Sequence, residues 1–123
     1  MQPLSVVLLQ GDSRIAQSLV NSLCRSFRSV HLVRSLDELR TSIAKHRAKL
    51  VVLDMETASM AEVERLSHDF PGTSIVCTHR LADEEMWTAA LNAGAADICP
   101  ASDTQAVLTS ALRHVTQAHG FAA

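Results

Sequence analysis

Short apolar runs recur along the chain at nearly regular intervals. The runs are SVVLL (5–9), VHLV (30–33), LVVL (50–53), SIVC (74–77) and ADIC (96–99). The first and third show no alternation of polar and apolar residues, which is typical of strands buried on both faces of a parallel sheet. The pattern therefore predicts five short strands.

The segments between these runs have the periodicity of helices. In the first segment, Ile15, Leu19, Leu23 and Phe27 recur every four residues, which places them on one apolar stripe of a helix over 13–27. The last segment predicts a helix whose apolar face is formed by Val107, Leu108, Ala111, Leu112 and Val115.

Several helix ends are marked by their residues. Ser35 with Glu38 and Ser59 with Glu62 fit the capping box, in which serine and glutamate satisfy each other's free backbone amides. Asp103 is placed to cap the last helix. Pro71-Gly72 and Gly94 predict the ends of the third and fourth helices.

Five alternating strand–helix units in 123 residues favour an α/β fold built on an open, doubly wound parallel sheet. An eight-stranded barrel needs a much longer chain. We expect residues 1–123 to form a single domain.

Candidate chemistry lies where these strands end, because ligands of such sheets bind beyond the carboxyl ends of the strands. Asp54 follows the third strand, Asp12 lies just after the first and Thr78 follows the fourth. Two carboxylates and a hydroxyl could hold Mg²⁺ or accept a phosphoryl group. The alternative is that Asp12 only caps the first helix and Asp54 begins a solvated loop. The sequence contains no glycine-rich phosphate loop, so a dinucleotide or ATP site is not predicted.

Composition excludes several other functions. Aromatic residues make up 3% of the chain and the net charge is −2, so we expect this domain to bind no nucleic acid.

The sequence predicts no signal peptide and no membrane span, and we expect a cytoplasmic location. Cys24, Cys77 and Cys99 lack metal-site spacing and are interpreted as small core residues in a reducing compartment.

The chain resembles the receiver domain of bacterial two-component response regulators over nearly its whole length. The resemblance rests on VVLLQGDSRIAQSL, LVVLD, SIVCT and ALNAGAADI (90–98). It implies a flavodoxin-like fold with strand order 2-1-3-4-5. It also implies that Asp54 accepts phosphate from a histidine kinase, that Thr78 is the switch hydroxyl, and that the face of the fourth helix, fifth strand and fifth helix rearranges.

The sequence departs from the family at several site positions. Gln10 and Gly11 stand where the family has two acids that hold Mg²⁺, and Asp12 comes one residue later. Ala101 replaces the lysine that pairs with the phosphoryl group. The remaining departures are Ala58 for a proline, His79 for a small residue, Ile98 for an aromatic residue and Ser102 for a proline.

These losses remove charge that stabilises a transferring phosphoryl group. Asp12, Asp54 and the backbone carbonyl of Glu56 are the remaining metal ligands that the resemblance implies, so Mg²⁺ binding is expected to be weak or absent. Arg14 or Arg80 is an alternative source of positive charge.

We therefore expect an atypical receiver domain, not an enzyme, with a histidine kinase or another signalling protein as partner. A homodimer through the fourth helix, fifth strand and fifth helix is a further expectation, because residues 104–119 contain one arginine and no other fully charged residue. Trp87, on the fourth helix, either covers the core or anchors a partner. The alternative function is an unphosphorylated scaffold module of a larger regulatory or pilus-assembly ATPase.

Overall fold

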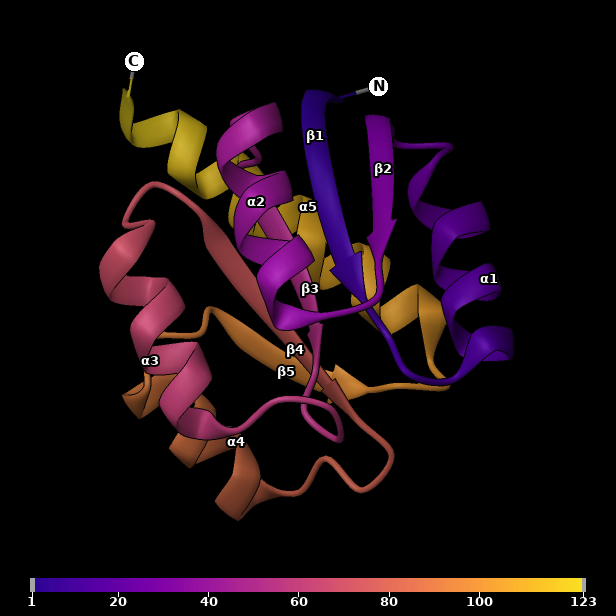
Figure 1. Cartoon of the computed structure of the whole chain (residues 1–123), viewed down its shortest axis with the longest axis vertical. Coiled ribbons are helices and arrows are strands. Elements are labelled where there is room, and N and C mark those ends of the chain that lie inside the picture. The colour runs from indigo at the N-terminus through magenta and orange to yellow at the C-terminus, as the bar shows by residue number, and fades with distance from the viewer. Residues whose placement is uncertain (1, 123) are drawn as a thin grey trace.

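The computed structural model describes residues 2–122, with the surroundings of side chains given for residues 3–115. Strands and helices alternate along the whole described chain (Figure 1). They are β1 (Gln2–Leu9), α1 (Ser13–Leu23), β2 (Phe27–Val33), α2 (Leu36–His46), β3 (Leu50–Asp54), α3 (Met60–Asp69), β4 (Ser74–His79), α4 (Glu84–Asn92), β5 (Asp97–Pro100) and α5 (Thr104–Ala122).

The five strands form one parallel sheet in the order β2-β1-β3-β4-β5. The sheet is covered by helices on both faces, and the strands all point towards the same end of the molecule, the lower end in Figure 1. This is the doubly wound α/β, flavodoxin-like fold that the sequence predicts, and the predicted strand order is confirmed.

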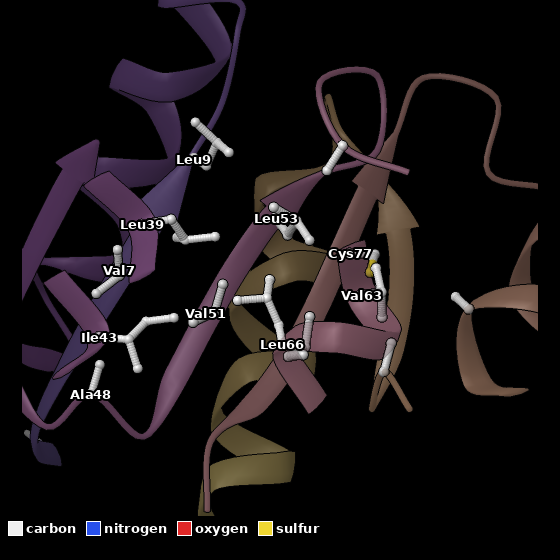
Figure 2. Close-up of a cluster of buried hydrophobic side chains, with 14 of the residues drawn as sticks. Val7, Leu9, Leu39, Ile43, Ala48, Val51, Leu53, Val63, Leu66 and Cys77 are labelled. Atoms are coloured by element: carbon white, nitrogen blue, oxygen red, sulfur yellow. The ribbon is translucent and has the colours of Figure 1, made fainter. Parts of the chain in front are cut away.

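Two apolar cores lie on opposite faces of the sheet. The first core contains side chains from α2, α3 and α4, among them Leu39, Leu66 and Ala90 (Figure 2). The second contains side chains from α1 and α5, among them Leu19 and Val107. Because β1, β3 and β4 contribute residues to both cores, their sequences are apolar without alternation.

The predicted serine caps are confirmed on their serine side only. Ser35 Oγ accepts a hydrogen bond from the Glu38 amide at 3.1 Å, and Ser59 Oγ accepts one from the Glu62 amide at 3.3 Å. In a capping box the Glu38 side chain would accept from the amide of Ser35. Here Glu38 Oε2 accepts from the amide of Arg34 at 2.8 Å. The glutamate therefore ties α2 to the chain before the cap.

The predicted end of the first helix at residue 27 is wrong. The helix ends at Leu23, Cys24 caps it, and Phe27 begins β2. Phe27 nevertheless packs in the same core as Leu19 and Leu23, with no exposed surface. A stripe of apolar residues does not reveal the turn, since Phe27 reaches the same core from the strand.

The fifth helix has the predicted apolar face. Val107, Ala111 and Val115 are buried, and Leu108 and Leu112 pack partly buried against the same core. Within residues 2–122, no helix is both long enough and apolar enough to cross a bilayer.

Candidate functional site

Asp54 lies at the carboxyl end of β3, inside the protein. Its relative exposure is 2%, and all five residues of β3 are buried. It is level with Thr78 of β4 in the sheet, and Thr78 has no exposed surface. The sequence prediction that Asp54 and Thr78 meet at one end of the sheet is confirmed, whereas a solvated loop position for Asp54 is not what the structure shows.

Both carboxylate oxygens of Asp54 accept hydrogen bonds within the protein. Oδ1 accepts from the amide of Glu56 at 2.9 Å. Oδ2 accepts from the amide of Gly11 at 3.0 Å and from the hydroxyl of Thr57 at 2.7 Å. Hydrogen bonds of this kind satisfy a buried carboxylate and stabilise its charged form. The carboxylate therefore joins the loop after β1 to the loop after β3.

Gly11 permits this close approach. A Cβ atom at this position would lie 3.3 Å from Asp54 Oδ2 and 3.1 Å from Thr57 Oγ1, which is tighter than ordinary van der Waals contact. Glycine therefore allows the backbone amide to reach the carboxylate.

Sequence reasoning missed Thr57, which makes the shortest of the three bonds to Asp54. The amides of Thr57 and Ala58 also bond to the Asp54 carbonyl, at 3.1 and 3.0 Å, so the loop turns back over the end of β3. The spacing Asp-x-x-Thr after a buried strand was the available signal, because such a turn brings a hydroxyl back to the carboxylate.

Gln10 is buried and occupies the first of the two positions at which the resemblance implies an acid. Its Oε1 accepts from the amide of Asp12 at 3.1 Å, and its Nε2 makes a long 3.5 Å contact with Thr78 Oγ1. A neutral amide thus connects β1 to the predicted switch hydroxyl, where a carboxylate would bring negative charge.

Asp12 is the N-cap of α1. Its Oδ1 accepts from the amides of Arg14 at 2.9 Å and Ile15 at 3.1 Å. The capping alternative is therefore the role that the structure gives to Asp12. Asp12 and Asp54 lie after neighbouring strands, but Asp12 accepts from the first turn of α1, whereas Asp54 accepts from the loops after β1 and β3.

The charged side chains at the rim pair with each other. Arg80 Nε lies 2.6 Å from Glu56 Oε1, and the Arg80 side chain is 74% exposed. Ala101, at the position of the implied lysine, is fully buried. Arg14 and Ala101 line a cavity of about 180 Å³ together with Ile15, Ser18, Ser102 and Thr104. Among the described residues, neither Arg80 nor Arg14 bonds to Asp54.

The oxygen atoms around Asp54 offer few ligands to a divalent cation. Oδ1 and Oδ2 already face three hydrogen-bond donors, and one oxygen of Asp12 faces two backbone amides. Across the described part of the chain, no three His, Cys, Asp or Glu side chains are grouped so that they could hold a metal ion. As it stands, the arrangement is a hydrogen-bonded carboxylate and not a cluster of acids.

The other residues that the sequence singled out also have clear places. His79 Nδ1 accepts from the amide of Leu81 at 2.9 Å, so its ring is bonded to the turn that follows β4. Trp87 is 46% exposed, and Leu81, which the sequence did not single out, is 75% exposed. The pKa of Cys77 is raised to about 12, first by burial and then by Cys99.

No protein-family model matches the sequence, and neither does the sequence of any curated protein. Solved structures do match. A response regulator from Thermotoga maritima has a TM-score of 0.83 and 18% identity, over 94% of this chain and 99% of that one. The N-terminal signal receiver domain of a two-component response regulator from Bacteroides fragilis has a TM-score of 0.81 and 17% identity. The match covers 90% of this chain and 95% of that one.

NtrX from Brucella abortus has a TM-score of 0.80 and 15% identity, over 98% of this chain but only 29% of that protein. The same fold therefore also occurs as one part of a longer chain. At these levels of identity the likeness concerns the fold: this chain shares the fold of response-regulator receiver domains.

Proposed function

We propose that this chain is an atypical receiver domain of two-component signal transduction, in which phosphorylation of Asp54 is impaired and signals pass by protein contact. One observation carries the proposal. The Asp54 carboxylate lies at the end of β3, where the resemblance implies a phosphoacceptor, and its two oxygens accept three bonds, from Gly11, Glu56 and Thr57. Three of the roughly four lone-pair sites of the carboxylate are therefore in use, so a phosphoryl donor would compete with these donors for the oxygens.

Missing charge adds to this barrier. Phosphoryl transfer depends on positive groups that neutralise the developing charge. Gln10 and Ala101 supply no such group and no strong metal ligand, and Arg80 is paired with Glu56. Mg²⁺ binding is therefore proposed to be weak or absent, and the chain is proposed to be a signalling module with no substrate of its own.

The proposed contact surface is formed by α4, β5 and α5. Trp87 and Leu81 are large apolar side chains exposed on α4 and on the loop before it. Exposed aromatic side chains are common anchors in protein interfaces. The proposed partners are a histidine kinase, another cytoplasmic signalling protein, or a second copy of this chain.

A second candidate function is supported by the same hydrogen bonds. With Asp54 held between two loops, the chain could act as a constant scaffold module within a larger regulatory or pilus-assembly ATPase. The scaffold function predicts an identical structure with and without a phosphodonor. It also predicts a partner contact that Asp54→Asn leaves unchanged.

The test is the intact mass of the protein after incubation with acetyl phosphate and Mg²⁺. Three proteins are compared: the natural sequence, Asp54→Asn, and the double variant Gln10→Asp with Ala101→Lys. We expect little or no added phosphoryl group on the natural sequence, none on Asp54→Asn, and clear addition to the double variant. Circular dichroism establishes that each sample is folded.

Two results would contradict the proposal. If the natural sequence gains a phosphoryl group as readily as the double variant does, Gln10 and Ala101 do not impair phosphorylation of Asp54. Addition that persists in Asp54→Asn would place the acceptor elsewhere.

A further inference from the structure

Two histidine rings stack between β2 and α2, away from Asp54. The ring centroids of His31 and His46 are 3.6 Å apart and the ring planes differ by 6°. His31 lies within β2, which is an edge strand of the sheet, and His46 is the last residue of α2. The stack therefore connects the C-terminal end of α2 to the edge of the sheet.

The inner nitrogen of His31 is sealed inside this contact. His31 Nε2 is buried and has no hydrogen-bond partner among the described residues. A buried polar nitrogen without a partner is tolerated far better on a neutral ring than on a charged one. The folded structure therefore favours the neutral form of His31.

The groups that face His31 would repel a proton. From α2 these are His46 and Lys45. From β1, Val7 lies beside His31 in the sheet and carries no charge. Along β2, the nearest charged residues are Arg28 and Arg34, three positions away on either side. Among residues 3–115, the neighbours that act on a proton at His31 are thus His46 and Lys45, and both disfavour it.

We propose that the His31–His46 stack is a proton-sensitive contact that releases the C-terminal end of α2 from β2 in mildly acidic solution. A charged His31 ring, 3.6 Å from the His46 ring and close to Lys45, would hold a buried N–H at Nε2 that has no acceptor among the described residues. Separation of the rings would give His31 Nε2 access to water. This proposal is independent of any phosphorylation of Asp54.

The direction of the pH effect follows from His31. Burial, then His46, then Lys45 lower the pKa of His31 below the ordinary value of 6.5. Between 6.5 and the lowered value, the released state binds a proton that the stacked state does not. The contact is therefore strongest well above pH 6.5 and weakens as the pH falls through 6.5, by at most about tenfold in the opening equilibrium for each pH unit, until the lowered pKa is reached.

The experiment measures titration and opening in the same full-length protein. NMR follows the ring protons of His31 and His46, and hydrogen exchange follows the amides of Arg47 and Ala48, which both bond to the Ile43 carbonyl. Exchange is compared at pH 7.5 and 5.5 as protection factors, which remove the intrinsic effect of pH.

Two variants complete the design. The double variant His31→Phe with His46→Phe keeps two flat rings but cannot take a proton; His46→Phe alone is the substitute if the double variant does not fold. His68→Gln is the matched control, because His68 is 89% exposed and lies on α3.

We expect His31 to titrate below pH 6.5 and the protection of Arg47 and Ala48 to fall on acidification in the natural sequence and in His68→Gln. The phenylalanine variants should show a several-fold smaller loss. A His31 midpoint at or above 6.5, or an equal loss of protection in the phenylalanine variants, overturns the proposal.

Discussion

The hydroxyl of Thr57 donates a 2.7 Å hydrogen bond to Asp54 Oδ2, from a position three residues further along the chain. The same oxygen accepts from the amide of Gly11, which lies in a different loop. Thr57 and Asp54 therefore help to hold two loops in place at the carboxyl end of the sheet. This arrangement underlies the first prediction.

Thr57→Val should destabilise the protein by about 1–2 kcal/mol, because valine has nearly the same shape but leaves the buried carboxylate with one donor fewer. The measurement is urea denaturation followed by circular dichroism. Thr88→Val is the control: Thr88 Oγ1 donates only to the neutral Glu84 carbonyl on an exposed helix, so its effect should be within about 0.5 kcal/mol. Equal effects of the two substitutions would argue against a special role for Thr57.

Gly94→Ala should destabilise the protein by about 2–4 kcal/mol. Gly94 ends the helical region at a φ of +107°, which residues with a side chain rarely adopt, and an added Cβ would lie 2.7 Å from Ser67 Cβ. Gly72→Ala is the matched control, since its added Cβ would lie 3.8 Å from the nearest atom, Lys49 Nζ. Thermal unfolding of both variants tests this, and a milder effect at Gly94 than at Gly72 would contradict it.

Among the cysteines, only Cys24 should react with iodoacetamide at pH 8 in the folded protein. Cys24 is exposed, so the prediction that it lies in the core is wrong, whereas burial, with Cys99 and Asp97 nearby, raises the pKa of Cys77 to about 12. Burial and Asp97 raise the pKa of Cys99 to about 11. Intact mass should show one added group per folded chain and three in denaturant, since the chain has three cysteines. Three rapid additions to the folded protein would disprove the burial of the two thiols.

The same two thiols set a direction for stability at alkaline pH. In the unfolded chain both release protons near the ordinary value of 9.0, while in the folded protein they keep them. The free energy of unfolding should therefore fall as the pH rises above about 9.

The fold was predictable from sequence because each strand and helix carries its own local pattern. The unbroken apolar run 50–53 requires a strand covered on both faces, and Ser35 and Ser59 place the starts of two helices. The end of α1 was not predictable, because Phe27 buries its ring in the core that the helix stripe also faces. Periodicity reports which core a residue reaches, and not from which element it does so.

The site was predictable only in part. That Asp54 and Thr78 meet follows from the rule that parallel strands end at one edge, and the structure confirms it. The choice between a cap and a metal ligand for Asp12 depends on where two backbone amides point, which residue types do not specify. Thr57 was missed because its only sequence signal is the spacing Asp-x-x-Thr, which points to the carboxylate only if the loop turns back over the end of β3.

The long contact between Gln10 and Thr78 has a consequence for how information could be carried. Thr78 is only the predicted switch hydroxyl, and a module in which it contacts a neutral amide beside an unphosphorylated Asp54 would keep one arrangement at this end of the sheet. The signal that such a protein carries would then depend on its concentration in the cell. Regulation of such a protein would act through its synthesis and turnover, over minutes to generations, and the quantity to follow is its abundance.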